Sequence, residues 1–422
     1  MTSRRLRILF LASYFPKPDN PQMGVWAMTQ AQALARQDVD LQVVSFTSWV
    51  PKAFAKTAGA KAYANCPDFY TWPGDVKVHY PRWLYYPVPP VKQQAYRYPQ
   101  PYLKLAIWSA KEQLYQQIET FQPDILFCHH ALPNGWFISQ ASKAANLPLI
   151  TSDYDFNEIS DSRNYPHRKA ALGTVVDRAT TMLCASNRME KEYQNLFPEI
   201  ESTKFQTLHH AIDPLGFQGL KTKPPAGFNN RQVVLSCALF AERKGVPILI
   251  EAFSQVCAKH PNAILRIIGS GPEEQKVKDT IARLNLSDRV QLVGKKPHQE
   301  VLQEMLWSDC FALVGWDEPF ATVYLEAMAA GKPIICCNDG GINDVVREGV
   351  QGYTVPPKSV AATADAIDRM LSNEAERTQM GQNAQRLIEQ HLTWDVKAKE
   401  LLQLMESAVS NHRPLNLSIA KQ

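Results

Sequence analysis

The sequence contains no run of about 18 apolar residues, the length that a membrane-spanning helix requires. Charge of neither sign dominates, since 45 Lys and Arg stand against 41 Asp and Glu and leave a net charge of +4. This excess is scattered, whereas a nucleic-acid-binding protein concentrates its basic residues in a stripe. The basic start, Met1–Arg7, precedes an apolar run that ends at Tyr14–Lys17 without a small-residue cleavage site, so it predicts a first strand rather than a signal peptide. We therefore expect a soluble cytoplasmic protein with no nucleic-acid partner and at most a peripheral contact with the inner face of a membrane.

Paired cysteine motifs are also missing. None of the eight cysteines belongs to a C-x-x-C pair, and six lie within apolar stretches: Cys128, Cys184, Cys237, Cys310, Cys336 and Cys337. Free cysteine is among the most buried residue types and packs as a small hydrophobe. The pattern therefore predicts reduced, buried thiols rather than a disulfide framework.

The length predicts two or three domains, because a domain usually takes roughly 100–200 residues. Short apolar runs alternate with helix-period segments such as Val246–Lys259 and Glu274–Leu284, which is typical of parallel α/β folds. The expected strands are Arg7–Ser13, Leu41–Phe46, Asp124–Cys128, Leu149–Thr151, Thr181–Ala185, Val233–Leu239, Ile264–Gly269, Val290–Val293, Cys310–Val314 and Pro333–Cys337. A Pro- and Gly-rich stretch, Leu220–Gly227, is typical of a linker. We predict two doubly wound, Rossmann-like domains, residues 1–225 and 226–391, followed by a helical pattern over Trp394–Met405.

The most informative segment is Trp316–Pro333, which follows the expected strand Cys310–Val314. Thr322 is a suitable N-cap, Gly331 stands where a C′ glycine belongs, and Pro333 stops the chain from continuing as a helix. We therefore predict a helix of about two turns between them. Its N-terminus opens at the C-terminal edge of a parallel sheet, where α/β folds bind ligands.

The chemistry of this segment favours a nucleotide sugar. Amides around Ala321, Thr322 and Val323, together with the helix dipole, form an anion site suited to a diphosphate. Glu318 lies on the loop beside these amides, and Glu326 lies about one turn into the helix. Carboxylates accept hydrogen bonds from sugar hydroxyls.

Glu318 and Glu326 are separated by seven residues within E-P-F-x-x-x-x-L-E-A-M-A-A-G-K-P. This spacing resembles the E-x7-E signature of the retaining family 4 glycosyltransferases (glycosyl transferases group 1), which have the GT-B fold. Further segments resemble the family in the same order along the chain: Tyr14–Pro16 with Gly24-Val25, His129–Gly135, Ala211–Asp213, Gly269–Glu273, Asp288–Val290, Gly340-Gly341 and Gly349–Pro356. The resemblance covers nearly the whole chain and is strongest from about residue 230 to residue 357.

The resemblance implies two Rossmann-like domains that face a cleft, with the nucleotide sugar bound mainly by the second domain and the acceptor by the first. A C-terminal helix, residues 392–410, is expected to pack back on the first domain. Glu318 would be a catalytic residue that contacts the donor sugar near its anomeric carbon, and Glu326 would bind the ribose hydroxyls. His129 would face the reacting sugar from the first domain. The diphosphate would be held by backbone groups at Gly24, Phe320, Ala321 and Thr322.

Lys244 would neutralise the diphosphate as a point charge. The family usually places an Arg five or six residues before this Lys, where this sequence has Leu239 and Ala238. Arg243 is the nearest guanidinium and is the candidate to replace it. The family's T-x-H-G segment also differs, because Thr151–Tyr154 lacks the His-Gly pair.

The segment Trp49–Trp108 breaks the α/β rhythm, being dense in Pro, Tyr and Trp without a clean periodicity. A loop of this length in a compact domain is usually functional or mobile. It is either a Pro-rich excursion packed on the surface or an acceptor-side or membrane-facing wall, since Trp and Tyr suit half-wet interfaces. The sequence favours neither interpretation.

Three short patterns resemble cofactor or metal sites. Gly269–Gly271 begins a dinucleotide-type G-x-G-x-x-G, but the third glycine is replaced by Glu274. Asp153-Tyr154-Asp155 mimics the D-x-D of metal-dependent glycosyltransferases, although acidic residues after a strand are more often turn residues. The pairs His129-His130 and His209-His210 have no ligand-spaced partner, and a structural role is favoured for the second pair. We expect neither a cofactor nor a metal.

The resemblance therefore implies a retaining glycosyltransferase that moves a hexosyl unit from a nucleoside diphosphate sugar to a hydroxyl of a glycan or lipid-linked acceptor. The resemblance implies a place in cell-surface polysaccharide or glycolipid assembly. Two alternatives are a sugar phosphorylase or epimerase on the same fold, and a non-catalytic nucleotide-sugar-binding protein, which the absence of an Arg near Leu239 would suit.

Overall fold

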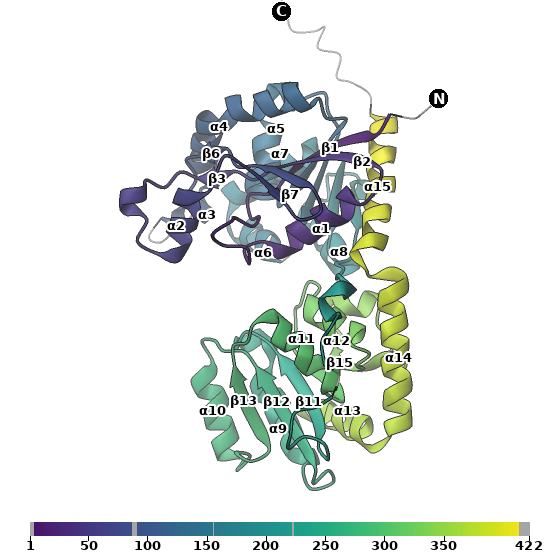
Figure 1. The fold of residues 1–422 in the computed structure, drawn as a ribbon. Coiled ribbons are helices and arrows are strands. Elements are labelled where there is room, and N and C mark those ends of the chain that lie inside the picture. The colour runs from purple at the N-terminus through teal and green to yellow at the C-terminus, as the bar shows by residue number, and fades with distance from the viewer. Residues whose placement is uncertain (1–3, 87–90, 155, 222, 413–422) are drawn as a thin grey trace, which may run out of the picture. The chain divides into compact units, whose positions relative to one another are not determined.

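The structure is a computed structural model that describes residues 4–86, 91–154, 156–221 and 223–412. Its contacts divide the chain into two compact units (Figure 1). The first contains the chain up to Leu208 together with the segment from Trp394, and the second contains His209–Thr393. The boundary therefore lies at Leu208 and not near residue 225. The Pro- and Gly-rich stretch is tied into the second unit, where the Lys221 amide donates a 2.8 Å hydrogen bond to the Gln303 side chain.

The first unit is built on an eight-stranded sheet in the order β10-β9-β8-β7-β1-β2-β5-β4. All neighbours pair parallel except β4 and β5. The central strand is apolar and buried on both faces, as a parallel strand covered by helices requires. The strands are β1 (Leu6–Leu11), β2 (Val39–Val44), β4 (Phe69–Trp72), β5 (Val76–His79), β7 (Ile125–His129), β8 (Leu149–Asp153), β9 (Thr181–Cys184) and β10 (Phe205–Thr207), with a separate parallel pair of β3 (Thr47–Ser48) and β6 (Arg82–Trp83).

Helices cover this sheet. Leu9 and Leu11 pack with buried residues of α4, and α15 from the end of the chain packs on α1 (Figure 1). The helices are α1 (Val25–Ala35), α2 (Ala58–Asn65), α3 (Lys92–Arg97), α4 (Pro99–Phe121), α5 (Trp136–Ser139), α6 (Asn157–Asn164), α7 (Pro166–Arg178), α8 (Asn187–Leu196) and α15 (Trp394–Asn411).

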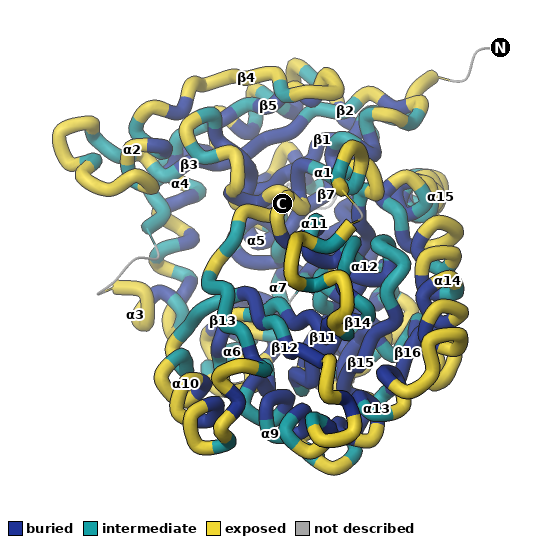
Figure 2. Tube along the Cα trace, turned by 60° about the horizontal axis from the view of Figure 1, so that its bottom comes forward, coloured by how far each residue is buried: buried dark blue, intermediate teal, exposed yellow. Residues whose placement is uncertain are grey.

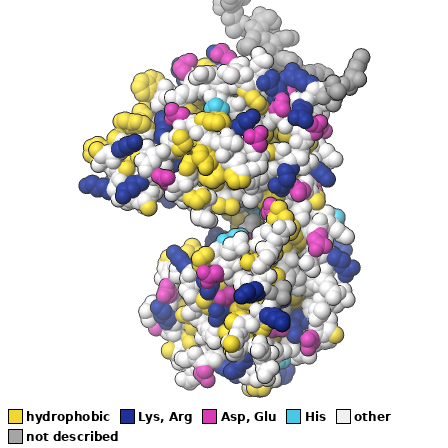
Figure 3. Space-filling view, viewed as in Figure 1, with side chains coloured by type: hydrophobic (Ala, Val, Ile, Leu, Met, Phe, Trp, Pro, Cys, Tyr) yellow, Lys and Arg dark blue, Asp and Glu magenta, His cyan; other side chains and the backbone are white. Residues whose placement is uncertain are grey.

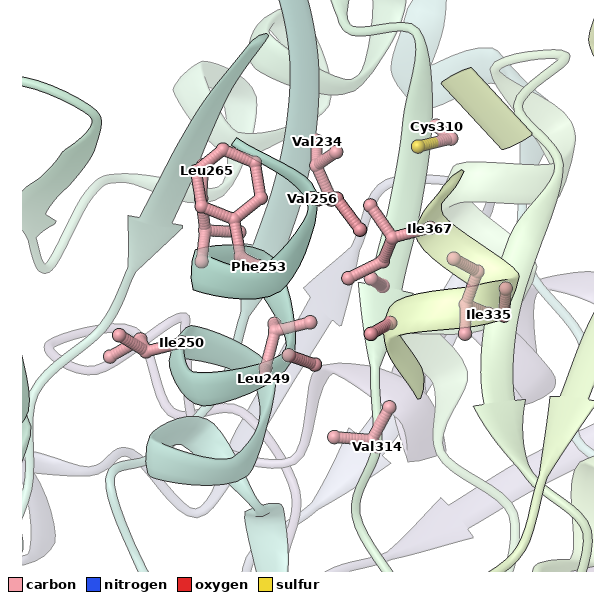
Figure 4. Packing of buried hydrophobic residues seen from close by; sticks show 14 of the residues in the cluster. Val234, Leu249, Ile250, Phe253, Val256, Leu265, Cys310, Val314, Ile335 and Ile367 are labelled. Carbon is pink, nitrogen blue, oxygen red and sulfur yellow. The ribbon is translucent and has the colours of Figure 1, made fainter. Parts of the chain in front are cut away.

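The second unit has a six-stranded, fully parallel sheet in the order β13-β12-β11-β14-β15-β16. Its strands are mostly buried, apart from the partly exposed edge strand β13, while exposed residues collect on turns and outer helix faces (Figure 2). Leu249 and Phe253 of α9 pack with Ile367 of α13 against apolar strand residues such as Leu265 (Figure 4). The elements are β11 (Gln232–Cys237), β12 (Ala263–Ile268), β13 (Val290–Gly294), β14 (Cys310–Leu313), β15 (Ile334–Cys337), β16 (Gly352–Val355), α9 (Val246–Val256), α10 (Glu274–Arg283), α11 (His298–Trp307), α12 (Thr322–Ala329), α13 (Val360–Ser372) and α14 (Glu374–His391).

The predicted α/β class with two parallel-sheet domains is confirmed, and each expected strand is present within two residues of its predicted bounds. No strand was predicted in the Trp49–Trp108 segment. In the structure it contains β4, β5 and β6 as well as α2 and α3. Among the described residues, no helix combines the length and the apolar character needed to traverse a bilayer.

Candidate functional site

The segment between β14 and α12 forms the centre of the candidate site in the second unit. Ala321 has an extended backbone and is the N-cap of α12, so Thr322 is the first helical residue rather than the predicted cap. Gly331 follows the helix with φ +73°, as the sequence predicted. The first amides of an α-helix have no acceptor within the helix, and they favour a bound anion.

Glu318 lies in this segment and is only 3% exposed. Its Oε1 is 2.7 Å from Lys244 Nζ and 3.3 Å from Arg243 Nη1. Its backbone carbonyl accepts a 2.9 Å hydrogen bond from the Gly341 amide. A buried carboxylate needs such partners, because desolvation of an isolated charge is costly. The structure thus brings three of the predicted site residues together.

Two loops must approach closely to make this contact. The loop after β11 contains a single 3-10 turn, η6 (Glu242–Lys244), followed by Gly245 with φ +66°. A Cβ on Gly245 would lie 2.6 Å from the Val314 carbonyl oxygen, so only glycine fits there. The Trp316 amide donates a 2.9 Å hydrogen bond to the Arg243 carbonyl, which holds the loop after β14 against η6.

Leu239 occupies one of the two positions where the family usually has an Arg, and its side chain is 56% exposed. Arg243 is half-exposed, whereas the Lys244 side chain is only 16% exposed. Arg243 therefore supplies a guanidinium beside Glu318 and keeps a solvent-facing part that a ligand can reach.

Glu326 projects from α12 and is engaged by a residue that the sequence did not single out. Its Oε1 is 2.8 Å from Nε2 of His298, the first residue of α11. This hydrogen bond raises the pKa of His298. A ribose hydroxyl that binds Glu326 must therefore compete with an imidazole.

Phe320 is buried, and the His209 ring packs on it with a centroid separation of 5.1 Å. The His209 Nε2 atom lies 3.1 Å from Asp344 Oδ2, and the His210 ring lies 6.4 Å from Phe320. His209 and His210 therefore pack beside Phe320 and support the segment that contains it, which is a structural role of the kind favoured from the sequence. No spacing rule in the sequence connects these residues, because they meet only through the fold.

Gly24 lies in the first unit, in the loop after β1, and is the N-cap of α1. Its φ is +63°, and a Cβ there would lie 2.3 Å from the Tyr14 carbonyl oxygen. The loop accordingly requires glycine at this position.

His129 ends β7 and is only 1% exposed. Its Nε2 atom contacts the Gln30 side chain and lies 3.3 Å from the Tyr154 hydroxyl. The next residue, His130, has φ +64° and lines a pocket of the first unit. The ring that faces this pocket is therefore His130, while the predicted catalytic residue His129 is held in the interior.

This pocket has a volume of about 300 Å³ and opens where β1, β7 and β8 end. Arg168 and Glu158 line it and form a paired contact of 2.7 Å and 2.6 Å, and the Arg168 guanidinium lies 4.4 Å from the centre of the Tyr96 ring. Burial raises the pKa of Glu158, although Arg168 opposes this effect. The ring-bearing side chains in its lining include Tyr14, Tyr63, Trp83, Tyr85, Tyr96 and His130.

Asp153 also lines the pocket, but both of its oxygens accept hydrogen bonds within the first unit, from the Ala131 amide at 3.1 Å and from the Tyr193 hydroxyl. Asp155, the second acid of the D-x-D pattern, lies outside the described residues. In the described part of the chain, no cluster of three or more His, Cys, Asp or Glu is arranged to hold a metal ion.

The chain matches two family models, Glycosyltransferase Family 4 over residues 23–214 and Glycosyl transferases group 1 over residues 221–387. It is 27% identical over 384 residues to a putative teichuronic acid biosynthesis glycosyltransferase, TuaC of Bacillus subtilis, covering 86% of this chain and 89% of that protein. Among solved structures, sucrose-phosphate synthase from Thermosynechococcus elongatus is similar with a TM-score of 0.71 at 18% identity, covering 96% of this chain and 100% of that one. Anabaena HepE in complex with UDP-glucose is similar with a TM-score of 0.63 at 19% identity, with the same coverage. At these identities the structural likeness shows a shared fold.

Proposed function

This chain is a family 4 glycosyltransferase of GT-B fold, and we propose that it transfers a hexosyl unit from a nucleoside diphosphate sugar to a hydroxyl acceptor with retention at the anomeric carbon. The observation that carries this proposal is the buried carboxylate of Glu318 with Lys244 and Arg243 at one oxygen, beside the N-terminus of α12. A carboxylate for sugar hydroxyls and cations for a diphosphate are the groups that a nucleotide sugar requires.

In the proposed reaction the bond between the anomeric carbon and the diphosphate breaks, and the diphosphate leaves with the electron pair. The acceptor hydroxyl oxygen forms the new bond to the anomeric carbon on the face that the diphosphate leaves, and its proton passes to the departing diphosphate. Lys244 and the amides at the start of α12 stabilise the departing negative charge by fixed, preorganised electrostatics. Glu318 contacts the sugar and stabilises positive charge at the anomeric carbon. Glu326 binds the ribose after exchanging its hydrogen bond with His298 for one with a hydroxyl.

The first unit supplies the acceptor side of the proposed reaction. Its pocket combines aromatic rings, which pack against the apolar faces of sugars, with the carboxylates of Asp153 and Glu158, which accept hydrogen bonds from hydroxyls. Both carboxylates already have donors, and each oxygen retains a lone pair for a hydroxyl. A glycan acceptor of cell-surface polysaccharide or glycolipid assembly has this chemistry.

A panel of nucleotide sugars in a thermal-shift assay tests the donor, because a ligand that binds only the native state raises the melting temperature. The donor that stabilises the protein is then incubated with hydroxyl acceptors, and the anomeric configuration of the product is read by NMR. A product with inverted configuration would contradict the retaining mechanism. Release of a sugar phosphate, or epimerised donor without transfer, would support a phosphorylase or an epimerase instead.

A further inference from the structure

The first unit exposes large hydrophobic side chains where two segments of the Trp49–Trp108 region meet. Phe54 is 74% exposed, Trp108 71%, Trp49 53% and Leu105 43%. Phe54 ends the short 3-10 helix η1 (Lys52–Phe54), and Leu105 and Trp108 lie on α4. Isolated exposed hydrophobes are normal on soluble proteins, so what matters is whether these four form one surface.

The fold brings Trp49 and Trp108 together. Leu105 lies three residues before Trp108 on α4, and Phe54 lies five residues after Trp49. The Trp49 amide donates a 3.0 Å hydrogen bond to the Trp83 carbonyl, and α4 packs on β6, which contains Trp83. Trp49 and Trp108 line the same groove of about 340 Å³. Figures 1 and 2 both show α2, β3 and α4 at one end of the unit, and Figure 3 shows hydrophobic and basic side chains side by side over the lobe that carries α2.

The charges around this surface are mostly positive. Residues 49–61 and 97–112 contain one acidic residue, Glu112, which lies 3.8 Å from Lys111 Nζ. Their other charged side chains are Lys52, Lys56, Lys61, Arg97, Lys104 and Lys111. Lys104 and Lys111 lie four residues before and three residues after Trp108, which places all three on one side of α4. We call Trp49, Phe54, Leu105 and Trp108, together with these six cations, the aromatic–basic patch.

We propose that the aromatic–basic patch docks this protein on the surface of an anionic membrane. Trp and Phe insert at the boundary between headgroups and acyl chains, and Lys side chains reach past an apolar surface to anionic headgroups. The excess of six cations over one acid in these two segments selects an anionic lipid surface over a neutral one, since each Lys or Arg near such a surface contributes favourable electrostatic energy.

Docking by this patch also bears on the acceptor. Trp83 lines both the groove beside Trp49 and Trp108 and the pocket that contains Glu158 and Arg168. A sugar bound in that pocket would lie next to the membrane-facing groove, which suits a sugar carried on a lipid anchor. This extension rests on the proposed function, whereas docking itself does not.

The experiment is co-sedimentation of the full chain with sucrose-loaded vesicles, one set of phosphatidylcholine and one of phosphatidylcholine mixed with phosphatidylglycerol, without donor or acceptor. We expect binding to the phosphatidylglycerol vesicles that weakens as salt is raised. Phe54→Ser and Trp108→Ser should each lower the partition coefficient roughly tenfold. Lys111→Gln should lower it roughly fivefold at low salt.

Matched controls come from outside the patch. Leu215→Ser removes a hydrophobic side chain of the second unit that is 58% exposed, and Lys399→Gln removes an exposed cation of α15. Both should bind vesicles as the unaltered protein does. Circular dichroism melting of each variant distinguishes loss of docking from loss of folding.

Three outcomes would overturn the proposal. The unaltered protein fails to sediment with either vesicle set, or it binds both sets equally, or Phe54→Ser and Trp108→Ser bind like the controls. Self-association that both substitutions abolish, without vesicle binding, would instead assign the patch to a second copy of the chain. Because the assay contains no nucleotide sugar, its result is independent of whether transfer occurs. If docking holds, transfer to a lipid-linked sugar should fall in Trp108→Ser while transfer to a water-soluble sugar is unchanged.

Discussion

At the scale of single residues, Glu318 explains how two cations can lie side by side in the second unit. Lys244 and Arg243 both contact Glu318 Oε1, so the carboxylate neutralises them in the free protein. In the proposed function, a diphosphate would bring additional negative charge to the same cations and leave the carboxylate available to sugar hydroxyls.

We therefore expect Glu318→Gln and Glu326→Gln to separate catalysis from nucleotide binding. Glu318→Gln should lower kcat by about 100-fold, because it removes charge stabilisation at the sugar, and should leave affinity for the free nucleoside diphosphate largely unchanged. Glu326→Gln should instead weaken that affinity, because in the proposed function Glu326 binds the ribose hydroxyls. Calorimetric titration of both variants with the free nucleoside diphosphate measures the difference, and an equal loss of affinity in the two would contradict the assignment.

The two cations can be tested separately. Lys244→Ala should weaken donor binding roughly tenfold, the loss expected for one charge-assisted contact. If Arg243 replaces the Arg missing near Leu239, Arg243→Ala should cost at least as much. Arg283→Ala is the matched control, because Arg283 pairs with Glu251 on the surface of the same unit. If Arg243→Ala leaves donor affinity unchanged, the amides at the start of α12 alone stabilise the phosphate charge that Lys244 does not neutralise.

Lys17 is a buried cation in the first unit whose ionisation affects stability. Its Nζ donates a 3.3 Å hydrogen bond to the Phe15 carbonyl and lies 5.0 Å from the centre of the Tyr63 ring. Burial lowers the pKa of Lys17 from 10.5 to about 8. Between these two pH values the unfolded chain binds a proton that the folded chain does not, so the free energy of unfolding rises with pH across this window, by at most about 3 kcal/mol.

We expect Lys17→Met to lose this dependence. Urea denaturation at pH 7, 8 and 9 measures the free energy of unfolding of both proteins. As the pH rises, the unaltered protein should gain stability relative to Lys17→Met. Exposed Lys61→Met should show a constant difference over the same range. Parallel curves for Lys17→Met would show that the buried amine stays charged.

At the scale of elements, the loops that follow the strands decide the geometry of the donor site. Gly245 and Gly294 both have positive φ, but a Cβ on Gly245 would collide with the Val314 carbonyl while a Cβ on Gly294 would meet nothing within 4 Å. Gly294→Ala should therefore lower the free energy of unfolding by only about 1–2 kcal/mol, the cost of a left-handed backbone in a residue with a Cβ. Gly245→Ala should cost more and also weaken donor binding, because it moves η6 and Lys244 away from Glu318. Equal donor affinity in the two variants, measured by calorimetry, would contradict this link.

Elements were predictable where the sequence repeats a simple pattern. Fully buried parallel strands such as β1 and β14 are continuous apolar runs, and their order along the chain fixes an α/β fold. The boundary at Leu208 was not predictable from composition, because the Pro- and Gly-rich stretch after it is held by contacts with α11. The strand β4 was missed because Phe69–Trp72 is exposed and lacks the apolar alternation of a half-buried strand. The strand β5 does alternate, but over only four residues.

In the candidate site, too, only the residues that belong to a sequence pattern could be predicted. Glu318 and Lys244 could be named because the family motif marks them, and Arg243 because it is the nearest guanidinium to the missing Arg. The structure brings the three together. His298 and the pair of Glu158 with Arg168 belong to no motif, so only the fold reveals their contacts. At His129-His130, the sequence could not indicate which ring faces the pocket, since that depends on the positive φ of His130.

At the scale of the whole molecule, each unit has its own sheet and core, and chemical groups are divided between them. The second unit holds the cations and the helix N-terminus that suit a diphosphate, and the first holds an aromatic pocket and the aromatic–basic patch. This division bears on the question of metal dependence, because the D-x-D acids belong to the first unit and the proposed diphosphate site to the second.

In D-x-D enzymes a divalent cation neutralises the departing diphosphate, so chelation stops them. Here Lys244 and the amides at the start of α12 supply positive potential to the proposed diphosphate site, and Asp153 is engaged by the Ala131 amide and the Tyr193 hydroxyl. We expect transfer to survive exhaustive chelation with EDTA, with a rate within about twofold of that before treatment. Asp153→Asn should retain metal-free activity in proportion to the folded fraction measured by circular dichroism, because the substitution changes a buried hydrogen-bonded carboxylate rather than a metal ligand. Loss of activity with chelator, restored by manganese or magnesium, would assign the ion-binding role to Asp153 and Asp155 after all.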